Sequence, residues 1–406
     1  MAHTIVLFGA TGFVGQIVAR HLFQRHGAGR ELRWAIAGRS EKKLKAVRAG
    51  LGDGAENLPL VVADANDDAA LKALCADTRV VASTVGPYAL CGSKLVRACA
   101  EAGTDYCDLS GEVQWIARMI AAHNDSARRT GARIVHGCGF DSIPSDLGTW
   151  FLQQRARERL GAPCAHVKLR VRNARGGVSG GTAASLMNAV REAGDPAARR
   201  LMADPYAITP GGSGGRPRQP EVRFAEYDDD ARSWIAPFVM AAINTRIVHR
   251  TNALAGDAYG TDFVYDEATL TGPGVRGLAT AIAMGAGIRG LMLAAALPPS
   301  RWLLKKFVLP EPGEGPSPEA QEKGGFDLRL FGIAKGGSVL CAKVTGDRDP
   351  GYGSTAKMLG EAAACLALDV PKAALSGGFW TPATALGERL LARLTAHAGL
   401  TFEVLD

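Results

Sequence analysis

The sequence predicts an α/β protein: a doubly wound parallel sheet followed by an inserted antiparallel α+β domain. A glycine-rich turn links an apolar strand to a helix at residues 5–15, and strands and helices then alternate regularly. Polarity alternates with a period of two after about residue 163, which is typical of strands with one solvated face. At 406 residues the chain exceeds one typical domain. We predict domains at 1–162, 163–345 and 346–406, the last being helices that pack back on the first.

The glycine turn is the strongest local signal. It has the spacing G-x-x-G-x-x-G between an apolar strand and an amphipathic helix. In such units the first glycine permits a tight turn, the second admits phosphate, and the third lets the helix pack closely. The alternative is that the glycines serve packing alone. We predict a Rossmann-type dinucleotide site, with Gly9, Ala10, Thr11, Gly12, Phe13, Val14 and Gly15 as cofactor contacts.

The end of the second predicted strand indicates which dinucleotide binds. Residues 32–40 contain no Asp or Glu to hold a ribose 2′-hydroxyl, and they end in Gly38, Arg39 and Ser40. A guanidinium beside a hydroxyl suits a 2′-phosphate. We therefore predict NADP as the cofactor, with Arg39 and Ser40 at its 2′-phosphate.

The next two strands, expected at 58–63 and 79–84, supply further cofactor contacts. Asp64 ends the first, where it accepts from the adenine amino group or caps the helix expected at 68–75. Tyr88 follows the second and either donates a proton or packs on the nicotinamide ring. The remaining predicted contacts, along the nicotinamide ribose, are Val85, Gly86 and Pro87.

Polar residues gather in two later loops, 108–112 and 137–146, after strands expected at 105–108 and 132–136. Hydride transfer needs fixed geometry and a proton source. We therefore treat the loop residues Asp141, Ser142 and Asp146, with Tyr88, as candidate catalytic groups, the alternative for the first three being ordinary helix caps. Cys138 has no adjoining histidine, which disfavours a nucleophile.

Composition excludes several function classes. The net charge of +7 is spread along the chain without a nucleic-acid motif, so anionic ligands explain it. The eight cysteines include no C-x-x-C or zinc spacing, and the histidines show no metal spacing. The chain opens on a strand, which predicts no leader segment and a cytoplasmic, reducing location.

The middle of the chain has a different pattern. Strands are expected at 164–173, 246–252, 258–266, 326–333 and 338–345, with a helix from about 182 and a loop at 209–220. The residues before that helix, 177–182, bind an anion or merely turn the chain. The C-terminal helices are expected at 356–368 and 382–397.

One segment is almost wholly apolar. Residues 278–297 carry a single charge, Arg289, and basic residues flank them as far as Lys306. Three interpretations remain open: a transmembrane helix, a membrane-touching or lipid-lining element, and a pair of buried helices broken by glycines at 285, 287 and 290.

Taken together, these motifs resemble the saccharopine dehydrogenase-like oxidoreductases, and most closely their trans-acting enoyl reductase subgroup. The resemblance covers nearly the whole chain. It rests on residues 9–15, 37–40, 85–88, 106–112, 139–146, 179–182, 352–358 and 377–383.

The resemblance implies NADPH-dependent reduction of an enoyl intermediate made by a polyketide synthase, within lipid metabolism. Two alternatives stay open: an NADP-dependent enzyme acting on a C–N or carbonyl substrate, and a lipid-associated protein with a non-catalytic nucleotide site. The expected partner is a small-molecule or carrier-bound lipid substrate, without metal or nucleic acid. A homodimer and a peripheral membrane contact through residues 278–306 are further expectations, so the cytoplasmic location extends to a membrane-associated one.

Overall fold

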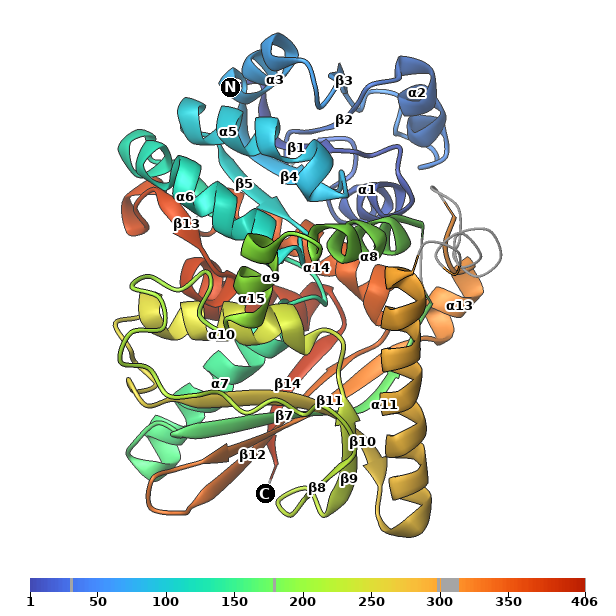
Figure 1. The fold of residues 1–406 in the computed structure, drawn as a ribbon. Helices are drawn as coiled ribbons and strands as arrows, with labels where there is room; N and C mark the ends of the chain where they lie inside the picture. Colours follow the sequence, from blue (N-terminus) through green and yellow to red (C-terminus); the bar gives the residue numbers. More distant parts are fainter. Residues whose placement is uncertain (30–31, 178–179, 298–299, 301–313, 406) are drawn as a thin grey trace.

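The computed structural model describes residues 1–29, 32–177, 180–297, 300 and 314–405. Within them, the strands form two sheets (Figure 1). One hydrophobic core includes residues of both sheets, and a second lies on the other face of the first sheet. The two sheets are therefore parts of one packed body.

The first sheet is parallel throughout its described strands, as predicted. Its central strands are apolar and buried on both faces, which suits a sheet covered by helices. In spatial order the strands are β13 (Gly378–Trp380), β6 (Arg133–Val135), β5 (Asp105–Asp108), β4 (Thr78–Ser83), β1 (His3–Phe8), β2 (Trp34–Gly38) and β3 (Leu60–Val62).

Helices cover both faces of this sheet. Glycines in the left-handed region end several of them, as Gly103 does at φ 74° and Gly131 at φ 81°. The helices are α1 (Phe13–His26), α2 (Glu41–Ala49), α3 (Asp68–Ala76), α4 (Tyr88–Cys91), α5 (Ser93–Ala102) and α6 (Val113–Thr130).

The second sheet is mixed. Most of its pairs are antiparallel as predicted, but β7 and β10 are parallel, because α10 and other elements cross between them. Burial alternates along β11, whose inward residues contact α7. In spatial order the strands are β14 (Leu400–Leu405), β12 (Val339–Gly346), β11 (Gly325–Ile333), β7 (His166–Arg175), β10 (Val264–Gly272), β9 (Ser233–Pro237) and β8 (Glu226–Asp228).

The strand predicted at 246–252 is wrong. These residues lie in the helix α10, which packs on α7 and β10, and nearly all of them are buried. A helix buried on several sides has no clear hydrophobic period, and its apolar run resembles that of a strand. The strand predicted at 258–266 begins later, at Val264. Other helices here are α7 (Ile143–Leu160), α8 (Gly180–Glu192), α9 (Pro196–Ala203) and α13 (Pro318–Lys323).

The apolar segment forms one continuous helix, α11 (Gly274–Ala296), at the side of the molecule (Figure 1). The interpretation as buried helices broken by glycine is therefore wrong, because most of α11 is exposed. Among the described residues it is the one helix that could cross a membrane by length and composition. The predicted contact residues 298–299 and 301–306, like 178–179 of the predicted anion loop, lie outside the described part of the chain.

The C-terminal part of the chain returns to both sheets. The helix α14 (Thr355–Leu368) packs on β1, β4 and β5 of the first sheet. The helix α15 (Pro382–His397) instead contacts α14 and α7. Two strands that were not predicted, β13 and β14, form an edge of each sheet. The remaining short elements are η1 (Pro350–Ser354) and η2 (Lys372–Ala374).

The domain boundaries stay a prediction. A boundary at residue 162 would assign α7 to the first domain. In the structure, α7 packs against β11 and β12 of the second sheet. Gly148 of α7 lies so close to this sheet that a Cβ there would be 3.0 Å from a methyl carbon of Val344.

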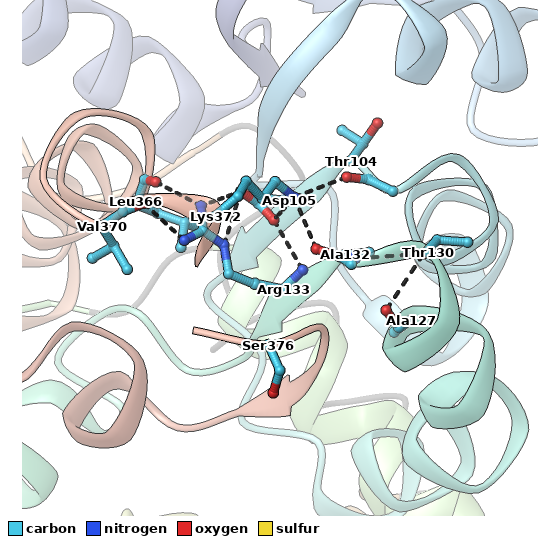
Figure 2. Close-up of polar contacts among 12 residues, drawn as sticks. Thr104, Asp105, Ala127, Thr130, Ala132, Arg133, Leu366, Val370, Lys372 and Ser376 are labelled. Carbon is cyan, nitrogen blue, oxygen red and sulfur yellow. Dashed lines mark hydrogen bonds and ion pairs between the residues drawn. The ribbon is translucent and has the colours of Figure 1, made fainter. Parts of the chain in front are cut away.

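A buried ion pair holds the C-terminal return to the first sheet (Figure 2). The Arg133 guanidinium donates to the Asp105 carboxylate, with 3.1 Å from Nε to Oδ2, and neither side chain is exposed. Its other N–H groups donate to the backbone carbonyls of Leu366 and Val370. Lys372 donates to the second carboxylate oxygen from a half-exposed position. One polar cluster thus joins the first sheet to residues 366–372.

We predict that Arg133→Met lowers the free energy of unfolding by about 3 kcal/mol, because it leaves the Asp105 carboxylate buried with Lys372 as its cation. Urea denaturation followed by circular dichroism measures the loss. Arg97→Met is the matched control, since Arg97 pairs with Asp68 on the surface and such a pair contributes about 1 kcal/mol or less. Equal losses in the two variants would contradict a special role for the buried pair.

Candidate functional site

The candidate site lies at the carboxyl ends of β1, β4, β5 and β6, where the loops after these parallel strands meet. Doubly wound sheets bind their ligands at this edge. The Thr84 hydroxyl after β4 donates to the Gly9 carbonyl after β1 with 3.1 Å between the oxygens. Asp141 after β6 lies near Gly111 after β5: a Cβ on Gly111 would be 3.7 Å from Asp141 Oδ1. The loops that hold the predicted site residues therefore lie together at one edge of the sheet.

The glycine turn fits a dinucleotide. Gly9 has φ 91°, and a Cβ there would lie 2.6 Å from a methyl carbon of Val85. A Cβ on Gly15 would lie 2.1 Å from the Gly9 carbonyl oxygen, so the helix can approach the strand only with glycine. Gly12 begins α1 without a side-chain cap, and the first turn holds no acid. The first-turn N–H groups, from Phe13, Val14 and Gly15, therefore suit a pyrophosphate.

The predicted 2′-phosphate contacts lie just after β2. Arg39 is exposed, and Ser40 is the N-cap of α2, with its hydroxyl oxygen accepting from the Lys43 N–H at 3.4 Å. The Ser40 O–H is still a donor in this arrangement. No acidic side chain stands in residues 32–40 to repel a phosphate. This end of the sheet therefore fits NADP.

Asp64 is not the cap of the following helix. Asp67 caps α3 by accepting from the N–H groups of Ala69 and Ala70. Asp64 instead accepts from the Asn66 N–H at 2.8 Å in a local turn. The cap interpretation thus belongs to Asp67, and the adenine contact predicted for Asp64 stays a prediction.

The Tyr88 hydroxyl has two partners in the protein. It donates to the Ser83 carbonyl at 3.0 Å and accepts from the Leu109 N–H at 3.1 Å. Burial and the Asp108 carboxylate raise the pKa of Tyr88 well above its usual value. This geometry supports a role in joining the loops after β4 and β5, so Tyr88 is a poor proton donor for catalysis. The loop before it, Val85, Gly86 and Pro87, lies against the glycine turn at Val85.

Glu112 fixes the same loop from the other side. Its carboxylate accepts from the backbone N–H groups of Tyr88 and Ala89 at 2.8 and 3.0 Å, and from the Ser185 hydroxyl. Sequence reasoning placed Glu112 in a polar loop without assigning it a role. Its spacing from Tyr88 gives no local signal, because the contact forms between loops at the ends of neighbouring strands.

Asp141 has the properties of a proton donor. It is partly buried at the mouth of the loops after β5 and β6. Burial, reinforced by the Asp108 carboxylate, raises the pKa of Asp141 to about 7. A carboxyl group with this pKa carries a proton in a large share of molecules at neutral pH and can deliver it. Of the three predicted catalytic residues, Asp141 fits the role best.

The Ser142 side chain belongs to a buried polar network that joins the two sheets. Its hydroxyl donates to the Asn244 amide oxygen at 3.3 Å, and Asn244 Nδ2 donates to Glu267 at 2.9 Å. The Tyr265 hydroxyl donates to the other Glu267 oxygen at 2.6 Å. Ser142 is therefore better suited to positioning the loop that carries Asp141 than to chemistry. Sequence reasoning missed Asn244 and Glu267, because neither lies in a recognisable motif.

Asp108, the last residue of β5, fixes the loops beside the site by accepting hydrogen bonds. Its carboxylate accepts from the Tyr106 hydroxyl and from the backbone N–H groups of Ser110 and Gly137. His136 Nδ1 lies 2.7 Å from its Oδ2. Both loops beside Asp141 are thus tied to one buried carboxylate.

The other residues weighed for catalysis have structural contacts. Asp146 accepts from the Thr251 hydroxyl and from the Ala383 N–H at the start of α15, so it joins α7 to two other helices. The Cys138 thiol is buried and donates to the Val135 carbonyl, and burial raises its pKa well above normal. Neither is placed to attack a substrate.

The loop that begins at Gly177 already holds a carboxylate. Asp349 accepts from the N–H groups of Gly177, Tyr352 and Gly353. Tyr352 in turn packs against Phe13 at the start of α1, with ring centroids 5.3 Å apart. The turn interpretation of this loop is supported at Gly177, and the loop lies beside the nucleotide-binding helix.

Comparison with known proteins agrees with this geometry. Residues 5–135 match the family model described as the saccharopine dehydrogenase NADP-binding domain. A Mycobacterium tuberculosis protein provisionally named a trans-acting enoyl reductase is 42% identical over 98% of this chain and 96% of its own. The trans-acting enoyl reductase of Mycobacterium ulcerans is 40% identical over 96% and 95%.

Apo saccharopine dehydrogenase (L-Glu forming) from Saccharomyces cerevisiae has the same fold, with a TM-score of 0.52 and 15% identity over 99% of both chains. The predictions of the fold class, of NADP as cofactor and of an oxidoreductase are confirmed.

We predict that Arg39→Ala weakens NADPH binding about tenfold or more and leaves NADH binding nearly unchanged. The reason is the loss of a charge-assisted contact that only the 2′-phosphate makes. Fluorescence titration with each nucleotide measures both constants. Arg33→Ala removes an exposed arginine at the other end of β2 and serves as the control. Equal losses for the two nucleotides would contradict the assignment of Arg39.

Proposed function

Since this chain belongs to the saccharopine dehydrogenase-like oxidoreductases, among the trans-acting enoyl reductases, we propose that it reduces an enoyl thioester carried by a separate polyketide synthase. The substrate would be an α,β-unsaturated acyl chain, lipidic in character. The name of the relatives supports a substrate bound to another protein, and their identity extends over the whole chain.

The observation that carries the proposal is the Asp141 carboxyl, whose pKa burial raises to about 7. It lies near Gly111 in the loop after β5, and the Tyr88 hydroxyl joins this loop to the predicted nicotinamide loop by accepting from the Leu109 N–H. Reduction of a conjugated alkene needs a hydride at the β-carbon and a proton at the α-carbon. NADPH, when bound, supplies the hydride. Asp141 holds the proton that completes the product, and the loops after β4 and β5 orient the thioester beside it.

The surrounding residues favour the protonated form of Asp141. The Asp108 carboxylate opposes a second negative charge nearby, and burial penalises the ionised form. Ser142, through Asn244, fixes the chain directly after Asp141. The Phe140 N–H donates to the Thr355 hydroxyl at 2.9 Å and fixes the chain directly before it. These contacts position the proton before substrate arrives, which lowers the barrier for transfer.

We predict that the purified protein oxidises NADPH when a long-chain enoyl thioester on an acyl carrier protein is added. NADPH absorbs at 340 nm and its oxidised form does not, so the fall in absorbance measures the reaction. The saturated thioester is the control substrate. NADPH binding without oxidation, across enoyl chains of different lengths, would overturn the proposal and favour a non-catalytic nucleotide site. Oxidation by a ketone or imine instead would favour a C–N or carbonyl substrate.

We predict that Asp141→Asn lowers kcat about a hundredfold or more, because the amide cannot deliver the proton. Wild-type kcat should fall as the pH rises through about 7, since Asp141 loses its proton there. The kcat of the variant should not show this decrease with pH, which we call the pH limb. Tyr88→Phe is the matched control, and it should keep the limb and most of kcat. A wild-type pH limb that survives in Asp141→Asn would assign the proton to another group.

A further inference from the structure

The buried positions of α11 hold different residue types from those of an ordinary surface helix. Its buried residues are small: Gly277, Ala281, Gly285 and Ala295. A Cβ on Gly277 would lie 1.9 Å from the Gly272 carbonyl oxygen, and one on Gly285 would lie 2.8 Å from the Phe224 ring. At Gly277 and Gly285 the inward face therefore admits only glycine. A surface helix of a water-soluble protein normally turns its large apolar residues inward.

Four large apolar side chains on one side of α11 are exposed, and Leu291 and Met292 are exposed on other sides of the helix. Val275 is 82% exposed, Ile282 43%, Leu293 64% and Leu297 57%. At 100° per residue these four positions fall within about 60° of one another around the helix. Their centre lies about 135° around the helix from that of the small inward residues. They form a continuous apolar stripe along a helix about 34 Å long, which we name the α11 stripe.

Arginines flank the α11 stripe on both sides. By the same geometry Arg289 lies about 20° beyond Ile282, and Arg276 about 60° beyond Leu297 on the other side. The Arg289 guanidinium lies 4.9 Å from the centre of the Phe224 ring and donates to the Arg223 carbonyl. No acidic residue occurs in the sequence from 268 to 310. The two charged residues of α11 itself are therefore both basic, and they flank an apolar centre.

An aromatic pair stands at the first turn of α11. Tyr227 and Trp234 pack edge to face with ring centroids 5.5 Å apart, and Tyr227 is half exposed. Trp234 pairs with Gly272 on β10, two residues before α11 begins. Tyrosine and tryptophan are favoured where an apolar environment meets water, because each ring has one polar group.

We propose that the α11 stripe docks on the surface of an anionic lipid bilayer, with the helix lying in the plane of the interface. The apolar stripe would enter the acyl boundary, and Arg276 and Arg289 would contact lipid phosphates on either side. The proposal rests on the shape and charge of this face and not on the reaction at the nucleotide site.

Two other arrangements fit the structure less well. The inward face of α11 packs on β9, β10 and α8, so a spanning helix would draw the polar strand β8 and its neighbours into hydrocarbon, where edge groups are costly. Pairing with a second copy through α11 would bring arginines together, since α11 itself carries no carboxylate. An anionic lipid surface is complementary both to the apolar stripe and to the arginines that flank it.

The test is flotation of the full-length protein with vesicles of phosphatidylcholine alone or mixed with phosphatidylglycerol. We expect binding to the mixed vesicles that weakens with added salt. Leu293→Glu and Ile282→Glu should each lower the partition coefficient about tenfold, because each removes an apolar contact and adds a repelled charge. Arg276→Glu should act only on the anionic vesicles.

Val339→Glu is the matched control. Val339 is 48% exposed and lies on β12, which β11 and β7 separate from β10 and α11. It should bind vesicles as the wild type does. NADPH titration confirms that each variant is folded, since α11 lies outside the proposed cofactor contacts. This readout also separates failure of lipid binding from failure of the proposed reaction.

The proposal is overturned if the wild type does not float with anionic vesicles, or if the α11 variants float as well as Val339→Glu. Light scattering identifies the competing occupant. A wild-type dimer that Leu293→Glu converts to monomers, without vesicle binding, would assign the stripe to a second copy of the chain.

Discussion

The buried pair of Asp105 and Arg133 fixes the position of α14, and through α14 it reaches the candidate site. The Arg133 guanidinium binds the carbonyls at the carboxyl end of this helix. At the amino end, the Thr355 hydroxyl accepts from the Phe140 N–H, directly before Asp141. A polar cluster at the amino ends of β5 and β6 therefore determines where a loop at their carboxyl ends lies.

The site combines two kinds of construction. The nucleotide half depends on backbone: a glycine turn, an uncapped helix and short loops that touch one another. The other half depends on buried side chains, with Asp108, Glu112 and Glu267 each receiving several hydrogen bonds. Burying these carboxylates costs stability unless they are fully bonded. The same burial gives Asp141 its altered proton affinity.

The sequence predicted the parts whose causes are local. The nucleotide turn was predictable because only glycine fits at Gly9 and Gly15, and Arg39 follows from the missing acid. Contacts between distant segments left no such signal. Asn244 reaches Ser142 from α10, a helix whose burial on several sides hid its period and led to a wrong strand prediction. The sequence also did not predict that β13 and β14 join different sheets, since short edge strands resemble loops in sequence.

That return has a consequence for synthesis of the protein. Residues 378–405 supply an edge strand to each sheet, so β6 and β12 have unpaired edges until those residues have left the ribosome. Exposed edges invite pairing with other chains. Neither sheet can finish folding as an independent unit during translation. The nascent chain would therefore depend on fast closure, or on a chaperone that shields these edges, until residues 378–405 have emerged.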